Sequence, residues 1–208
     1  MPWITVGTTE VLQQQDAQSC GYCCIGMALH RVHGRRDTES SIVATGARLE
    51  GGAYDRRTGD RVGLVATPLV AAAAAQGDLE HWGSGTYGNH LARVLTEGYN
   101  LQATYHGGRS TAQMKAAMRS VSADQSMIAL VLWNGGGGGH WVLVTGRATR
   151  GWGSASDYTI LDPAGEVTVN RGSTAYTSSG GAGTFAGYYV MVGTRQVVTG
   201  QTARVKVM

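Results

Sequence analysis

The most informative stretch of this chain is residues 19–34, which read SCGYCCIGMALHRVHG. Cys20 opens an apolar run, and the run ends in a basic group just before Gly34. Ser19 is a suitable N-cap, basic side chains favour the negative end of the helix dipole, and Gly34 is a natural helix stop. The pattern therefore predicts one helix, with Cys20 at its positive N-terminal end.

The residues that follow this helix favour further helices. Residues 38–49 predict a second short helix, and residues 51–63 have the composition of an exposed loop. Residues 67–76 are rich in alanine and predict a helix, with Pro68 near the start, where its missing N–H is harmless. Residues 88–97 predict one or two more helical turns.

The pattern changes to strands from Leu101 onward. Ser110 and Gln113 form a capping box at the start of a helix that runs to Arg119. A continuous apolar run, residues 126–133, leads into Asn134 and five consecutive glycines. The predicted strands cover 101–106, 126–133, 140–146 and 158–163, with weaker ones at 166–169, 188–192 and 196–207 and a Ser/Gly-rich loop at 178–183.

These elements predict an α+β fold with helices first and antiparallel strands second. A chain of 208 residues is long enough for one full hydrophobic core and too short for two large domains. We therefore expect a single domain, with a helical lobe over about residues 1–100 and an antiparallel sheet lobe over about residues 101–208.

The composition argues against two classes of partner. The formal charge is only +3, and the basic residues are scattered without an aromatic-interleaved stripe, so we expect no nucleic acid partner. No apolar stretch reaches the roughly 20 residues of a membrane-spanning helix, and the N-terminus lacks the pattern of a signal peptide. We expect a protein that is cytoplasmic as synthesised, with no membrane partner.

The three cysteines are clustered at Cys20, Cys23 and Cys24. This odd, closely spaced set cannot form a spread disulfide framework, so at least one thiol remains for chemistry or packing. A nucleophilic cysteine needs its pKa lowered by a helix N-terminus and a nearby imidazolium. Cys20 has the first by position, and it is the candidate nucleophile.

His140 and Asp162 are the candidate base and the residue that orients it. His140 begins a strand directly after the glycine run, at a sheet edge, and can supply the imidazolium. Asp162 ends the strand expected to pair with the His140 strand, where it can fix the tautomer and orientation of the imidazole. Acyl transfer also needs donors for the oxyanion, and Gln14, six residues before Cys20, can supply a side-chain amide beside a backbone N–H.

In these residues the chain resembles the papain-like cysteine peptidases. The similarity is greatest to the bacterial double-glycine peptidase family, which trims leader peptides, and to related free-standing effector proteases. The matching residues are Gln14, Ser19-Cys20-Gly21, the small residues Cys23 and Cys24, Met27-Ala28, His140-Trp141-Val142-Leu143-Val144 and Ile160-Leu161-Asp162-Pro163. The resemblance leaves residues 35–101 and everything after Gly165 unmatched.

The resemblance implies a papain-like fold whose cleft separates the helical lobe, with Cys20, from the sheet lobe, with His140 and Asp162. It implies that Cys20 is the nucleophile, His140 the base, Asp162 the orienting residue and Gln14 the oxyanion donor. The implied reaction is hydrolysis of a peptide or isopeptide bond, after small residues such as Gly-Gly, through a thioester and without a cofactor. The family also suggests a bacterial toxin or effector, secreted into a target cell, with a protein or peptide substrate and a cognate inhibitor or immunity protein.

Several alternatives stay open. Aligned in the register of the plant enzymes, Cys23 becomes the nucleophile, but Ala17 instead of a glutamine then lies six residues upstream. Cys20-Gly21-Tyr22-Cys23 is also a redox dithiol motif, although no buried strand precedes it. The same triad would serve a peptidoglycan amidase, a deamidase or a transglutaminase-like enzyme. The chain could also be a binding module whose cysteines are structural. A zinc site is a further alternative, although the sequence lacks a second close pair of ligands.

The remaining candidates receive no catalytic role. The other histidines show no partner pattern; they are His30, His33, His81, His90 and His106. Trp133 and Trp141 lie on predicted strands and are expected in the core, with a cleft position for Trp133 as the alternative. The glycine run lacks the lysine and helix of a phosphate-binding loop, and we expect it to order when substrate binds.

Overall fold

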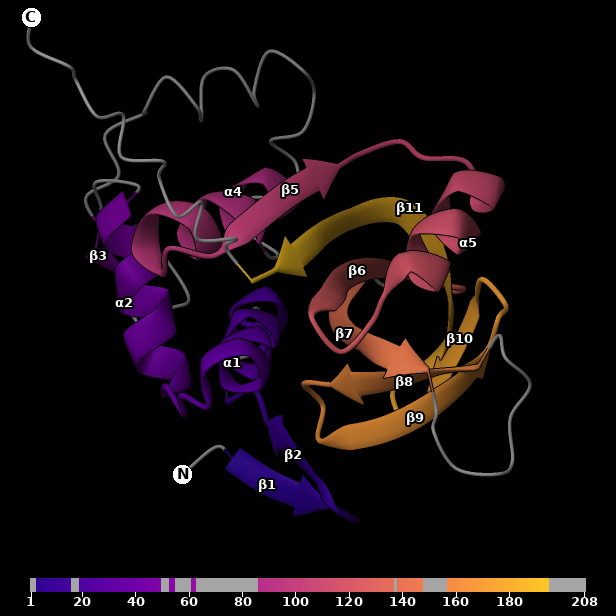
Figure 1. Ribbon diagram of the computed structural model, residues 1–208, viewed down its shortest axis with the longest axis horizontal. Coiled ribbons are helices and arrows are strands. Elements are labelled where there is room, and N and C mark those ends of the chain that lie inside the picture. Colours follow the sequence, from indigo (N-terminus) through magenta and orange to yellow (C-terminus); the bar gives the residue numbers. More distant parts are fainter. Residues whose placement is uncertain are drawn as a thin grey trace, which may run out of the picture.

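The computed structural model describes residues 3–15, 19–49, 53–54, 61–62, 86–136, 138–147 and 157–194. Within these ranges the fold is α+β, with four α-helices and a large antiparallel sheet (Figure 1). The sequence-based prediction of this fold class is confirmed at that level. No helix in the described part of the chain combines the length and apolar character that crossing a membrane requires.

Helix α1 spans Cys20–His33 and is the central helix of the fold. Its first ten residues are all buried, and Gly34 ends it in the left-handed conformation, φ 67°, with its N–H bonded to the His30 carbonyl. The predicted boundaries are therefore confirmed. Ser19 occupies the N-cap position without a side-chain capping bond. Its hydroxyl instead hydrogen bonds to Cys23.

Three further helical elements surround α1 in the first half of the chain. Helix α2 spans Glu39–Leu49, and helix α4, Gly88–Arg93, continues into the π-helix η2, Val94–Gly98. In Figure 1, α1 lies between α2 and the curved sheet. The predictions for residues 38–49 and 88–97 are confirmed.

Two short hairpins were not predicted. Strands β1, Trp3–Val6, and β2, Thr9–Leu12, pair antiparallel, and the last two residues of β2 are fully buried against α1 in one apolar cluster. Strands β3, Ala53–Tyr54, and β4, Arg61–Val62, pair within the stretch expected to be a loop. The rest of that stretch, and the helix predicted at residues 67–76, lie outside the described residues.

The main sheet has seven strands, and all its pairings are antiparallel. The strand order is β10-β11-β6-β7-β8-β9, with β5 also paired to β11. The strands are β5, Gln102–His106; β6, Gln125–Trp133; β7, Gly139–Arg147; β8, Asp157–Asp162; β9, Glu166–Arg171; β10, Ala175–Ser178; and β11, Gly181–Gly193. The strands expected at 101–106, 126–133, 140–146, 158–163 and 166–169 are confirmed.

The C-terminal part of the sheet corrects one prediction. Residues 178–183 were expected to form a loop, but β10 and β11 form a tight hairpin there, with Ser178 paired to Gly181. The small polar residues of this stretch are typical of loops. They can nevertheless form a hairpin, because the ladder hydrogen bonds come from the backbone and need no apolar side chain. The strand expected at 188–192 is the end of the 13-residue strand β11. The strand expected at 196–207 lies outside the described residues.

Helix α5, Thr111–Ser120, packs on the sheet and begins as predicted. The Ser110 hydroxyl accepts from the Gln113 backbone N–H, and the Gln113 side chain accepts from the Ser110 N–H. Just before the helix, Arg109 bonds to Gly187 of β11. A Cβ at Gly187 would lie 2.1 Å from the Arg109 carbonyl oxygen, so this close approach requires glycine.

Two apolar clusters lie on the two faces of the sheet. The first joins α1, α2 and α4 to one face, where Ile128, Trp141 and Leu143 point. The second lies on the opposite face under α5 and includes Val131 and Val142. Because side chains alternate along a strand, His140 points to the second face and Trp141 to the first.

Candidate active site

Helix α1 packs against β7 so that two sulfur atoms contact the main chain of one residue. The Trp141 backbone N–H donates to the Cys20 sulfur at 3.5 Å. One turn along the helix, the Cys24 thiol donates to the Trp141 carbonyl oxygen at 3.3 Å. The start of α1 is therefore held directly beside the strand that carries His140.

His140 is the second residue of β7, and its ring joins two groups from other elements. Its Nε2 lies 2.6 Å from Oδ1 of Asp162, the last residue of β8. The Cys20 side chain lies close enough to the ring to raise the pKa of His140. Because Nε2 faces the carboxylate, Nδ1 is the nitrogen left for the sulfur. The structure therefore pairs His140 with Asp162 and places Cys20 beside the next residue of β7, Trp141.

Asp162 is completely buried and is bound by three donors. Oδ1 faces His140 and also accepts from the Ala164 backbone N–H at 2.7 Å. Oδ2 accepts a hydrogen bond from the hydroxyl of Tyr176 on β10. Burial opposes ionisation, yet the bonds from His140, Tyr176 and Ala164 hold the pKa of Asp162 below its ordinary value.

The same contacts raise the pKa of His140. Burial disfavours the imidazolium, but the hydrogen bond to Asp162 and the nearness of Cys20 raise the pKa to about 10. At neutral pH the ring is therefore protonated and can donate a proton from either nitrogen. The ring of Trp133 stacks on it, with centroids 5.6 Å apart.

The other two thiols are poorly suited to nucleophilic attack. Burial, followed by the nearby Glu39 carboxylate, raises the pKa of Cys23, and burial raises that of Cys24. Both side chains are fully buried, whereas Cys20 keeps 5% exposure. All three are free thiols. Among the three cysteines, the contact with His140 distinguishes Cys20.

Gln14 lies beside the segment that follows Asp162. Its backbone N–H donates to the Pro163 carbonyl oxygen at 2.8 Å, which connects the end of β2 to the turn after β8. Its side-chain Oε1 is buried, with no hydrogen-bond partner among the described residues. No hydrogen bond among the described residues joins the Gln14 amide to Cys20, and its role as oxyanion donor remains a prediction.

No protein-family model matches this chain. A search of curated proteins likewise finds no match. Within the described residues, no group of three or more His, Cys, Asp or Glu side chains could hold a metal ion.

Two further residues touch the site: Trp133, for which a cleft position was the alternative prediction, and Tyr176, which was not predicted. Val131 pairs directly with His140, and Trp133 lies two residues further along β6 on the same face, so it is the diagonal neighbour of His140. The predicted pairing of these two strands was enough to infer this position. Tyr176 gave no such signal. It reaches Asp162 because β10, at one edge of the strand order, lies beside β9, at the other edge.

A missed contact lies further along α1, where Tyr22 bonds to His90 of α4 at 3.0 Å. His90 is 2% exposed and was given no role from the sequence. This buried pair connects the first turn of α1 to the neighbouring helix. The Tyr22–His90 bond therefore helps to hold the first turn of α1, and with it Cys20, in position.

Proposed function

We propose that this chain is a papain-like cysteine hydrolase that cleaves peptide bonds in a protein or peptide substrate. The observation that carries the proposal is the position of the His140 ring, which bonds to Asp162 and lies near Cys20 at the start of α1. A thiol, an imidazole and an orienting carboxylate in this arrangement are the parts needed for nucleophilic catalysis.

In the proposed reaction, the Cys20 sulfur attacks the carbonyl carbon of the scissile bond. The His140 imidazolium gives a proton to the leaving nitrogen as the C–N bond breaks, which leaves a thioester on Cys20. Neutral His140 then takes a proton from a water molecule, and the hydroxide formed attacks the thioester. The acid product leaves, and the thiolate and the imidazolium are restored.

The supporting groups act on His140 and on the oxyanion. Asp162 orients His140 through Nε2 and favours its protonated form. The backbone N–H groups at the start of α1 and the Gln14 amide would stabilise the oxyanion. The fully buried carboxylate makes no contact with substrate in this scheme.

The test is to express the wild type and Cys20→Ala in cells and to profile the new protein N-termini. We expect a set of new N-termini that depends on Cys20 and persists in the matched variant Cys23→Ala. New N-termini that persist in Cys20→Ala, or that are absent from the wild type, would contradict the proposal. Release of ammonia without any new N-terminus would instead indicate a deamidase acting through the same three residues.

A further inference from the structure

Tyr176 occupies the side of Asp162 that faces away from His140. The tyrosine is 3% exposed, and its hydroxyl donates to Oδ2, whereas His140 and Ala164 bind Oδ1. Asp162 itself is 0% exposed, so water cannot replace a lost donor. Both carboxylate oxygens are therefore satisfied by fixed protein groups.

This arrangement fixes the plane of the carboxylate. The terminal torsion of an aspartate side chain is broad, so a carboxylate with one donor can rotate about it. Donors on both oxygens remove that freedom, since rotation would break the Tyr176 bond. Oδ1 is then kept directed at His140, and the ring is kept directed at Cys20.

The hydroxyl of Tyr176 is itself well positioned. The Tyr176 ring lies between two aromatic neighbours, Phe185 at 5.9 Å and Trp133 at 6.2 Å between centroids. Its backbone is held in the ladder, where Tyr176 pairs with Gly183. Trp133 also stacks on His140, so one aromatic side chain contacts both the base and the tyrosine.

We infer that Tyr176 is a positioning residue of the site, which holds Asp162 ionised and oriented so that His140 can activate Cys20. The inference rests on the proposed function, because it assigns a role within the same site. Tyr176 lies on β10, so this role makes the hairpin of β10 and β11 part of the support of the catalytic site.

The Tyr176 bond also affects how the reactivity of Cys20 depends on pH. Asp162 supports the imidazolium only while it is ionised, and the Tyr176 bond lowers its pKa. Tyr176→Phe removes the hydroxyl and keeps the ring, so the carboxylate takes up a proton at higher pH than in the wild type. The acid limb of Cys20 reactivity then moves toward neutral pH.

The experiment measures the rate of Cys20 alkylation by iodoacetamide from acid to neutral pH, with the labelled peptide identified by mass spectrometry. At the pH where the wild type has half its maximal rate, we expect Tyr176→Phe to react about fivefold more slowly. The matched control is Tyr189→Phe, a buried tyrosine of the same cluster whose ring stacks on His106. Its acid limb should coincide with that of the wild type.

A coincident acid limb in Tyr176→Phe would overturn the inference, and so would an equal shift in both tyrosine variants. If Tyr176→Phe does not fold, the ¹³Cζ chemical shift of labelled Tyr176 at neutral pH, in the wild type and in Asp162→Asn, replaces it. The chemical shift should differ between the two proteins because the Tyr176 hydroxyl donates to the carboxylate, and an unchanged chemical shift would overturn the inference. Failure of the proposed function gives a different result, in which His140→Ala leaves Cys20 alkylation unchanged.

Discussion

The imidazole of His140 lies almost parallel to the indole of Trp133, with centroids 5.6 Å apart and planes 21° apart. A cation over the face of an indole is stabilised by the negative charge of the ring face. The stack therefore adds to the contacts with Asp162 and Cys20 that favour the imidazolium. It also makes Trp133 a spectroscopic reporter of the charge on His140.

The raised pKa of His140 predicts how stability depends on pH. A group whose pKa is higher in the folded state contributes stability that is complete below its unfolded value, 6.5, and lost as the pH rises through about 10. We expect the free energy of unfolding to fall over this interval in the wild type and to fall less in His140→Gln. Urea denaturation at several pH values measures the free energy of unfolding. An equal fall with pH in the wild type and in His140→Gln would contradict the raised pKa of His140.

Trp133 allows the same titration to be followed in the folded protein. Tryptophan fluorescence should change as His140 loses its proton, with a midpoint near pH 10 in the wild type. The change should vanish in Trp133→Phe and in His140→Gln. A change retained in Trp133→Phe would assign the signal to another tryptophan.

The three cysteines should differ in reactivity. At neutral pH we expect iodoacetamide to label Cys20 in the folded protein, and to label Cys23 and Cys24 only in urea, because burial raises the pKa of those two thiols. Removal of the imidazolium in His140→Ala should slow Cys20 labelling by about tenfold or more. His33→Ala, at the exposed end of α1, is the control. An equal rate of Cys20 labelling in the wild type and in His140→Ala would show that His140 does not activate Cys20.

Gln14 tests the oxyanion part of the proposal. We expect Gln14→Ala to lower turnover by about 100 to 1,000-fold on a substrate found by N-terminal profiling, with little change in the free energy of unfolding. The backbone bond to Pro163 is kept in this variant, because it does not involve the side chain. The matched control is Gln15→Ala, at the exposed neighbouring position. An unchanged turnover in Gln14→Ala would remove the residue from the mechanism.

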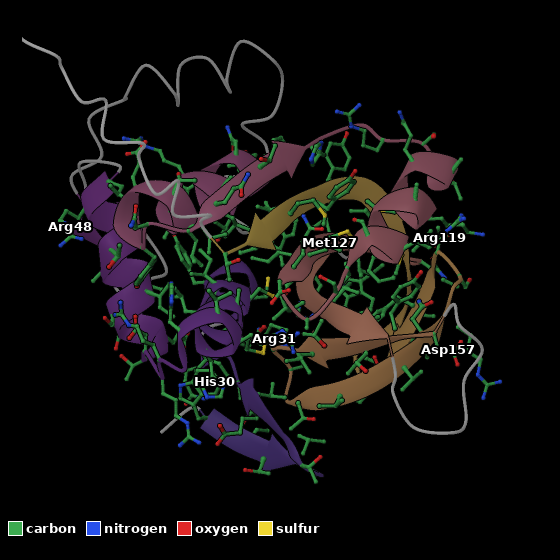
Figure 2. The ribbon with its side chains drawn as sticks, in the orientation of Figure 1. His30, Arg31, Arg48, Arg119, Met127 and Asp157 are labelled. Atoms are coloured by element: carbon green, nitrogen blue, oxygen red, sulfur yellow. The ribbon has the colours of Figure 1, made fainter. Side chains whose placement is uncertain are left out.

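Arg31 connects α1 to the sheet beyond the site. Its guanidinium donates to the Thr145 carbonyl oxygen at 2.8 Å and to the Ser126 hydroxyl at 3.2 Å, and both of these residues are buried. Figure 2 shows Arg31 reaching from α1 toward the strands, whereas Arg48 projects outward from α2. We expect Arg31→Met to lower the free energy of unfolding by about 1 kcal/mol or more. Chemical denaturation measures it, and an equal loss in Arg48→Met would show that the sheet contacts contribute nothing.

Much of the fold could be predicted because its signals are local. The ends of α1 follow from a glycine stop and an apolar run, and the start of α5 follows from the capping box at Ser110. The hairpin of β1 and β2 also has a local signal, the glycine turn at Gly7 between two short segments that contain apolar residues. The hairpin of β10 and β11 was missed because glycine and serine in its ladder resemble a loop.

The sequence by itself determined the α+β class, the position of Cys20 at a helix start, and the positions of His140 and Asp162 at strand ends. Those properties depend on residues a few positions apart. Only the tertiary structure decided that Trp141 contacts a sulfur 121 positions earlier, and that Tyr176 and Trp133 surround the His140–Asp162 pair. Such contacts depend on how the faces of α1 and the sheet pack and on where distant strands return, and residue patterns along the chain do not encode those distances.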